Sequence, residues 1–118
     1  MATIKSFSDL QQSKKLAEIL PLESADMCYI QDLLAGGKYG DYKPYIGNLI
    51  PAYGQDKIKC WSLAALLGVL PDYTLQTNTD GTVFVVCDSK KPMISDAYDN
   101  PVDACVAMIE KLNELKML

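Results

Sequence analysis

The chain has 118 residues, of which 49% are hydrophobic and 22% charged, which is ordinary for a single globular domain. Its net charge is −4 and all eleven basic residues are lysines, which disfavours a nucleic-acid reader built on arginine and a positive surface. The absence of histidine removes the commonest general base near neutral pH.

Targeting signals and paired metal ligands are also missing. Met1–Ser8 contains no apolar signal core, and the apolar stretch Cys60–Pro71 is too short to span a bilayer. We therefore predict a cytoplasmic protein with reduced thiols and no membrane association. No two cysteines lie close enough in sequence to form a zinc-binding pair, so we interpret all four as buried apolar side chains: Cys28, Cys60, Cys87 and Cys105.

The first predicted helix spans Ser6–Leu20. Ser8 is the expected N-cap, with Gln11 as its capping-box partner, and Pro21 ends the helix. The next segment, Glu23–Leu34, fits either a short buried strand or a helix, because periodicity does not distinguish the two in so short an apolar run. We favour strand or extended structure.

Glycine and proline dominate the segment Ala35–Lys59, which holds five of the seven glycines together with Pro44 and Pro51. This density predicts an irregular loop, with one short strand near Tyr45–Leu49. The loop also holds four tyrosines, which form either a binding surface or a cover of aromatic rings over the core. We favour the cover and keep all four as candidate interaction residues: Tyr39, Tyr42, Tyr45 and Tyr53.

The clearest short helix is Cys60–Leu70, with Ser62 as its N-cap. Trp61 and Leu66 have the spacing of a hydrophobic staple. The helix is apolar around nearly its whole circumference, which predicts burial on all sides. Gly68 within it indicates the close approach of another backbone.

A β-hairpin follows, with strands Tyr73–Thr77 and Thr82–Cys87 around an Asp-Gly turn. A loop of two or four residues places the following side chains together on the core face: Tyr73, Leu75, Thr77, Phe84 and Val86. A loop of three residues reverses that assignment. The second strand is apolar on both faces, so it is either central in the sheet or covered by another element or subunit. We assign Val83 and Val85 as candidate interaction residues on its second face.

A polar connection, Ser89–Asp99, leads to the last helix, in which Asn100 is the expected N-cap and Pro101 the first residue. This helix should lie across the inner face of the hairpin. Its expected apolar side consists of Val102, Cys105, Val106, Met108, Ile109, Leu112 and Leu115.

Candidate catalytic groups are sparse. An acidic cluster, Asp96, Asp99 and Asp103, does not match a calcium-loop pattern, and helix-dipole electrostatics account for the last two. A cysteine nucleophile would need a nearby base, and the chain has no histidine. We predict no catalytic, cofactor-binding or metal-ligating residue, and no enzymatic activity.

A family resemblance rests on four stretches of the chain: Asp9–Leu16 (DLQQSKKL), Ser24–Met27 (SADM), Cys60–Leu67 (CWSLAALL) and Tyr98–Ala104 (YDNPVDA). Their order and spacing resemble small uncharacterised proteins encoded by phages, prophages and mobile elements of Bacteroides-type gut bacteria. The resemblance implies a cytoplasmic setting and a mobile-element origin, and it assigns no activity, cofactor or site residue.

Together the patterns predict one α+β domain over residues 1–118, with an N-terminal helix, a loop-rich middle and a helix–hairpin–helix unit whose small antiparallel sheet packs on helices. The favoured function is a non-enzymatic accessory protein that binds a protein partner, a second copy in a homodimer included. A nucleic-acid-associated accessory protein is the alternative, and a small carboxylate-based enzyme is a third hypothesis.

Overall fold

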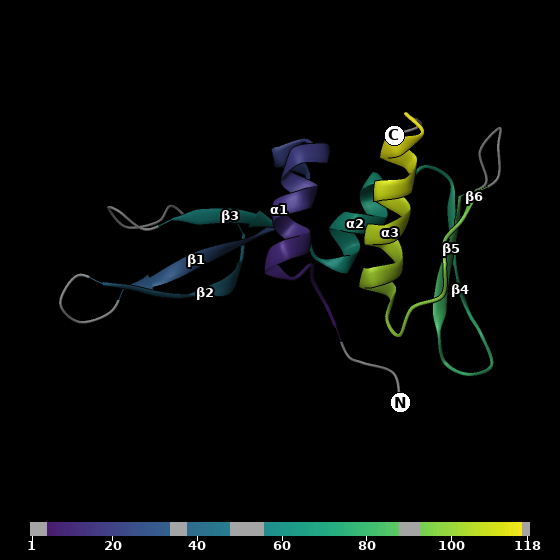
Figure 1. The fold of residues 1–118 in the computed structure, drawn as a ribbon, viewed down its shortest axis with the longest axis horizontal. Coiled ribbons are helices and arrows are strands. Elements are labelled where there is room, and N and C mark those ends of the chain that lie inside the picture. The colour runs from purple at the N-terminus through teal and green to yellow at the C-terminus, as the bar shows by residue number, and fades with distance from the viewer. Residues whose placement is uncertain (1–4, 34–37, 48–55, 88–92, 117–118) are drawn as a thin grey trace.

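Helices occupy the middle of the molecule and a small sheet lies at each end (Figure 1). The computed structural model describes residues 5–33, 38–47, 56–87 and 93–116. In these ranges the fold contains three α-helices and two three-stranded antiparallel sheets, which confirms the predicted α+β class. The helices are α1 (Leu10–Ile19), α2 (Leu63–Val69) and α3 (Pro101–Glu114), with a 3₁₀ turn η1 (Leu22–Ser24). The strands are β1 (Met27–Leu33), β2 (Tyr39–Ile46), β3 (Lys57–Cys60), β4 (Tyr73–Thr77), β5 (Val83–Cys87) and β6 (Met93–Ile94).

Helix α1 begins at Leu10, four residues after the predicted start at Ser6, and its N-cap lies one residue after the predicted Ser8. Its N-cap is Asp9, whose carboxylate accepts from the Gln12 N–H at 2.8 Å, while the Gln12 side chain accepts from the Asp9 N–H at 3.0 Å. The predicted N-cap, Ser8, is buried, and its hydroxyl accepts from the Trp61 N–H at 3.1 Å. That contact forms because the segment before α1 runs beside residues 61–63, so Ser8 is not available as a cap.

The first sheet has the order β2-β1-β3 and occupies much of the segment expected to be an irregular loop. The extended structure favoured for Glu23–Leu34 is confirmed by β1. The prediction of an irregular loop at Ala35–Lys59 is wrong, because this range contains β2 and all of β3 except its last residue, Cys60. The strand expected near Tyr45–Leu49 is instead β2, which ends at Ile46; residues 48 and 49 lie outside the described ranges.

Pro44 is compatible with β2 because of its register. The Gly47 N–H donates to the Asp26 carbonyl at 2.8 Å, and hydrogen-bonded pairs alternate with non-bonded pairs along an antiparallel ladder. Pro44, opposite Tyr29, therefore occupies a non-bonded position, where its missing N–H faces away from β1. The proline costs the sheet no hydrogen bond.

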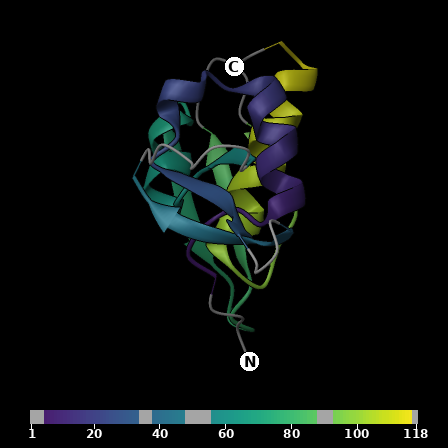
Figure 2. The ribbon, with the colours of Figure 1, turned by 90° about the vertical axis from the view of Figure 1, so that its left-hand side faces the viewer.

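One face of the first sheet packs against the N-terminal segment and α1, as Figure 2 shows with the sheet turned toward the viewer. This small core contains Met27, Tyr29 and Cys60, with Phe7 and other partly buried side chains around them. The Phe7 and Tyr29 rings meet edge to face, with centroids 6.3 Å apart.

The larger core lies between α1, α2, α3 and β5. The predicted N-cap of α2 is confirmed, because the Ser62 hydroxyl accepts from the Ala65 N–H at 3.2 Å. Trp61 is fully buried and its indole N–H donates to the Ser24 hydroxyl at 2.9 Å. Burial of α2 on all sides is not observed, since Ala64 and Gly68 are exposed. Among the described residues, no backbone approaches Gly68 closely, because a Cβ there would meet nothing within 4 Å.

The second sheet has the order β4-β5-β6 and contains the predicted hairpin. Its loop holds three residues, because the Asn78 N–H donates to the Thr82 carbonyl at 2.8 Å and Gly81 takes the left-handed conformation with φ +90°. The odd loop length makes the first face assignment wrong, because Leu75 pairs with Val85. The side chains that face α3 from the central strand are Val83, Val85 and Cys87, all buried.

Helix α3 begins as predicted, with Asn100 accepting from the Asp103 N–H at 2.9 Å and Pro101 in the first turn. Its expected apolar side is buried except for Leu115, which is 51% exposed and caps the helix end. The connection before α3 is not wholly irregular, because it contains β6, which pairs with β5.

Candidate functional site

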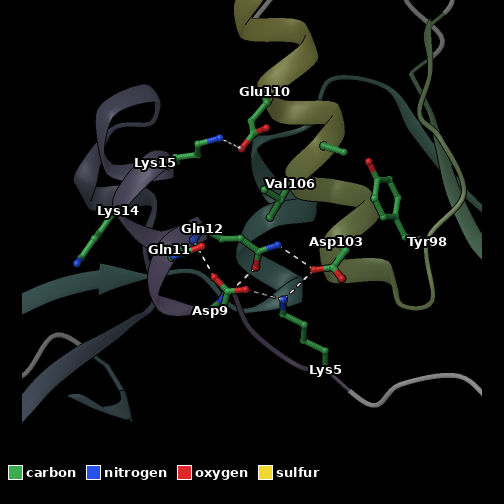
Figure 3. A pocket seen from close by; sticks show the side chains of 11 residues that line it. Lys5, Asp9, Gln11, Gln12, Lys14, Lys15, Tyr98, Asp103, Val106 and Glu110 are labelled. Atoms are coloured by element: carbon green, nitrogen blue, oxygen red, sulfur yellow. Dashed lines mark hydrogen bonds and ion pairs between the residues drawn. The ribbon is translucent and has the colours of Figure 1, made fainter. Parts of the chain in front are cut away.

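A polar groove of about 710 Å³ lies between α1 and α3 (Figure 3). Helix α1 contributes one wall, with Gln12 and Lys15, and α3 contributes the other, with Asp103 and Glu110. Lys15 and Glu110 approach to 3.9 Å across it. Side chains of opposite charge from the two helices therefore meet across this groove.

Asp103 is the centre of the polar contacts in this groove. Its carboxylate accepts from Lys5 at 2.7 Å, from the Gln12 side-chain amide at 2.8 Å and from the Asn100 side-chain amide at 2.8 Å. Burial would raise the pKa of Asp103, but these hydrogen bonds outweigh it and hold the pKa below its ordinary value. Asp103 is thus an ionised anchor that ties the N-terminal segment and α1 to α3, rather than a proton donor near neutral pH.

Lys5 completes the anchor from the other side. Burial would lower the pKa of Lys5, but its hydrogen bonds to Asp103 and Asp9 raise that pKa above its ordinary value. The Lys5–Asp9 contact is 3.2 Å long. An ammonium held between two carboxylates stays charged, so Lys5 is unsuited to act as a nucleophile.

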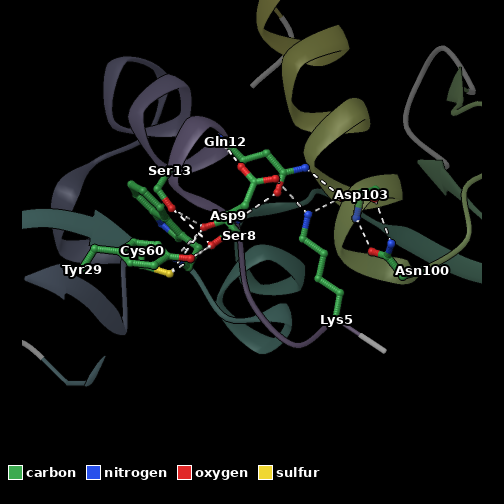
Figure 4. A network of polar contacts seen from close by, with 10 residues as sticks. Lys5, Ser8, Asp9, Gln12, Ser13, Tyr29, Cys60, Asn100 and Asp103 are labelled. Carbon is green, nitrogen blue, oxygen red and sulfur yellow. Dashed lines mark hydrogen bonds and ion pairs between the residues drawn. The ribbon is translucent and has the colours of Figure 1, made fainter. Parts of the chain in front are cut away.

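A second polar cluster is buried beneath the start of α1 (Figure 4). The Tyr29 hydroxyl donates to the Ser8 carbonyl at 2.8 Å, and the Ser8 and Ser13 hydroxyls are 2.7 Å apart. The Cys60 thiol donates to the Ser8 carbonyl at 3.4 Å. Burial raises the pKa of Tyr29 to about 12. Each hydroxyl in this cluster has a partner, so its role is to join α1 to the first sheet.

The thiols are poorly suited to nucleophilic catalysis. All four cysteines are free and buried, and burial raises the pKa of Cys60, Cys87 and Cys105, in the last case to about 12. A thiol with a raised pKa is protonated near neutral pH, whereas the thiolate is the reactive form. In the described part of the chain, no group of three acidic, histidine or cysteine side chains is arranged to hold a metal ion.

The outer face of the second sheet carries apolar side chains from β5 and β6. Among the described residues, no other element covers this face (Figure 1). Phe84 and Val86 point to this face from the central strand and are half-buried. Val86 pairs with Ile94 of β6, which is 58% exposed. Thr74 and Gln76 of β4 are polar, uncharged neighbours on the same face. We name this set, Thr74, Gln76, Phe84, Val86 and Ile94, the outer sheet face.

The structure separates the residues first assigned to interaction surfaces. Val83 and Val85 are 8% and 0% exposed, so the prediction that they form an accessible surface is wrong. The accessible side chains of β5 are instead those of Phe84 and Val86, each one residue after the valines that we predicted. The sequence signal that could have shown this is Gly81, which takes the left-handed conformation at the last position of a three-residue loop. The loop length determines which side chains of β5 point to each face of the sheet.

The tyrosines do not form one surface within the described residues. Tyr42 and Tyr45 lie on opposite faces of β2 because they are three residues apart. The Tyr42 hydroxyl donates to Asp56 at 2.6 Å, which raises the pKa of Tyr42, whereas the Tyr45 side chain is 40% exposed. The side chain of Tyr39 and the whole of Tyr53 lie outside the described part of the structure.

The face of the first sheet opposite α1 carries lysines. It contains two cross-strand rows, each with a buried apolar residue in its middle: Tyr45–Cys28–Lys59 and Lys43–Ile30–Lys57. The Lys43 side chain is 58% exposed and lies 3.9 Å from Asp32. This is the most basic face formed by described strands, although the chain as a whole is acidic.

A smaller hollow, of about 480 Å³, lies at the end of the first sheet and is mainly apolar. Phe7, Met27, Pro44 and Ile46 line it, and Ile46 is 85% exposed.

Comparison with known proteins adds no assignment. No protein-family model, curated protein or solved structure matches the chain. Among the helices of the described residues, none is both long and apolar enough to cross a membrane.

Proposed function

We propose that this chain is a non-enzymatic protein-interaction module that binds a protein partner through the outer sheet face. We further propose the phage-like, mobile-element and cytoplasmic setting that the sequence resemblance implies. The single observation that carries the binding proposal is that β5 has apolar side chains on both faces, whereas α3 covers only one of them.

The chemistry of the outer sheet face supports a protein partner. The cores of protein interfaces are depleted in charged residues, and neither β4 nor β5 contains a charged residue. Full burial of an aliphatic or aromatic side chain contributes about 1.5–3 kcal/mol. Since Phe84, Val86 and Ile94 are already partly covered, a partner would gain roughly 2–4 kcal/mol from burying what remains exposed. That is enough for the centre of a modest interface.

The polar sites support a non-catalytic role. The Asp103 carboxylate is occupied by three donors, and Lys5 is held between two acids. Burial keeps the thiols of Cys60, Cys87 and Cys105 protonated. These groups stabilise the fold in positions where a catalytic group would need a free lone pair or a labile proton.

The test is affinity capture with the tagged full chain, comparing Val86→Lys and Ile94→Lys with the wild type. We expect the partner protein to be recovered with the wild type and lost with both variants, because each places a charge on the outer sheet face. Ile46→Lys is the matched control, since Ile46 is 85% exposed on the other sheet and should retain the partner. Circular dichroism verifies that the variants are folded. Recovery of the same proteins with all four chains would refute the proposed binding face.

A nucleic-acid-associated function is the second candidate, and the lysine rows of the first sheet favour it. On this face Lys43 and Tyr45 are exposed, whereas Lys57 and Lys59 are partly buried. An exposed lysine can contact a phosphate backbone, and an exposed tyrosine can stack on a base. The net charge of −4 counts against it. Gel shifts with single-stranded and double-stranded DNA and RNA at low salt decide the matter. Binding that weakens with added salt and with Lys43→Glu supports this candidate, and no binding at low salt eliminates it.

A further inference from the structure

Strand β4 is an edge strand whose outward backbone groups can be identified from the register. The Asn78 N–H donates to the Thr82 carbonyl, so the hydrogen-bonded pairs of β4 with β5 are the alternate ones, Gln76 with Phe84 and Thr74 with Val86. The other side of β5 agrees with this parity. Val85 exchanges hydrogen bonds with Ser95, and Val83 with Tyr98.

The remaining residues of β4 therefore point their N–H and C=O groups away from the sheet. They are Tyr73, Leu75 and Thr77, and none of them has a backbone partner within the described ranges. The Tyr73 side chain is 41% exposed and Thr77 is also exposed. A row of unpaired backbone groups on a strand of this length is a template for another strand.

The other described edges carry features that discourage strand addition. The edge of β2 contains Pro44, whose missing N–H faces outward, and β3 carries Lys57 and Lys59. Strand β6 has only two residues. Proline, lysine and short length are the usual means by which proteins protect sheet edges. By contrast, β4 has five residues (YTLQT) with no proline and no charge.

The β4 sequence is complementary to itself in an antiparallel arrangement. A two-fold axis at Leu75 places Leu75 opposite the same residue of a second copy and Tyr73 opposite Thr77. The outward N–H groups of each strand then meet the outward C=O groups of the other. Asp72 falls opposite Asn78, so no like charges face each other along the pairing.

We propose that a second copy of this chain adds to the sheet at the β4 edge, antiparallel and centred on Leu75, to form a homodimer with a continuous six-stranded sheet. The proposal does not rest on the proposed function, because it uses the outward backbone groups of β4, although Thr74 and Gln76 of that strand also belong to the outer sheet face. Isologous contacts of this kind are the commonest way in which a chain self-associates.

Light scattering coupled to gel filtration, over a range of concentrations of the full chain, tests the proposal. We expect the wild type to have twice the 13.0 kDa mass of one chain. Leu75→Pro removes an outward N–H that makes no bond within the monomer, but it also removes a side chain that packs against the larger core. Circular dichroism therefore first verifies that the variant is folded. The folded variant should have a dimer dissociation constant at least about tenfold higher than that of the wild type. A wild type that stays monomeric at every concentration would overturn the proposal, as would a dimer that Leu75→Pro leaves intact.

A charge-swap pair guards against a variant that only weakens the fold. In the proposed pairing Thr74 faces Gln76 of the second copy, and both side chains are exposed. The double variant Thr74→Lys/Gln76→Lys and the double variant Thr74→Glu/Gln76→Glu should each be monomeric, because like charges then face each other. An equimolar mixture of the two should recover the dimer mass. If each variant dimerises alone, or if the mixture remains monomeric while both are folded, the β4 edge is not the interface.

Discussion

Two neighbouring valines of β5 can be used to test which of its side chains face the core. Val85 is 0% exposed and faces α3, whereas Val86 is half-buried on the outer sheet face. Replacing each with alanine removes the same two methyl groups from the same strand. The two changes therefore differ in the face from which those groups are removed, while the loss of β-propensity is shared.

Truncation at Val85 leaves a cavity in a closed core. The buried side chain contributes about 1.5–3 kcal/mol, and the surrounding residues relax only partly into the space. We expect Val85→Ala to lower the free energy of unfolding by about 2 kcal/mol. Val86→Ala should cost less than about 1 kcal/mol, because the lost methyl groups were partly in contact with water.

Urea denaturation followed by circular dichroism measures both values. The midpoint should fall markedly for Val85→Ala and little for Val86→Ala, with unchanged m-values. Thermal melts should show a decrease of roughly 8 °C for the first variant and under about 4 °C for the second. Equal losses, or a larger loss at Val86, would refute the observed register and restore the face assignment made from an even loop length.

Two further predictions concern backbone conformation and charge. Gly81→Ala should destabilise the protein by about 1–2 kcal/mol, because Gly81 has a φ of +90° that alanine adopts only with strain. Gly68→Ala should stabilise the protein by up to about 1 kcal/mol, because Gly68 lies in a helix. Denaturant midpoints that move in the same direction for both variants would contradict these predictions. The pKa of Asp103 is lower in the folded state than in the unfolded state, where it is about 4. The stability that the Asp103 carboxylate contributes is therefore fully present above pH ~4 and is lost as the pH falls through its folded pKa. Asp103→Asn should therefore cost about 1–2 kcal/mol at pH 7 and progressively less below pH ~4, and an unchanged difference across acid titration would exclude the anchor role.

Local patterns were enough to predict the helices and the hairpin. Proline and the Asx and Ser caps are short-range signals, so Ser62 was correctly predicted as the N-cap of α2, and Asn100 and Pro101 as the start of α3. The predicted range of α2, Cys60–Leu70, was too long, because Cys60 belongs to β3. The N-cap of α1 was predicted one residue too early, because a contact with a residue far away in the sequence determines the position of Ser8. Ser8 is bonded to Trp61, 53 positions away, and no local pattern contains that contact.

The first sheet could not be predicted for a related reason. Its strands contain Gly40 and Pro44, which indicate a loop when only neighbours in sequence are considered. The pairing with β1 makes Pro44 acceptable, because its missing N–H faces outward. In the candidate site, the apolar character of both faces of β5 was visible in the sequence. Which pair of residues is accessible depended on the length of one turn.

The residues at which the chain enters and leaves the first sheet lie side by side. Met27 pairs with Cys60, and the Asp26 carboxylate accepts from the Ser62 N–H at 2.9 Å. The segment 27–60 therefore leaves the helical region and returns to it at one point, as an inserted unit does. Insertions or deletions at the far end of this segment would change its reach while leaving α1 and α2 in place, since lengthening a closed loop adds little entropic cost. We therefore expect the length of the segment 27–60 to be variable without effect on the helices or the second sheet.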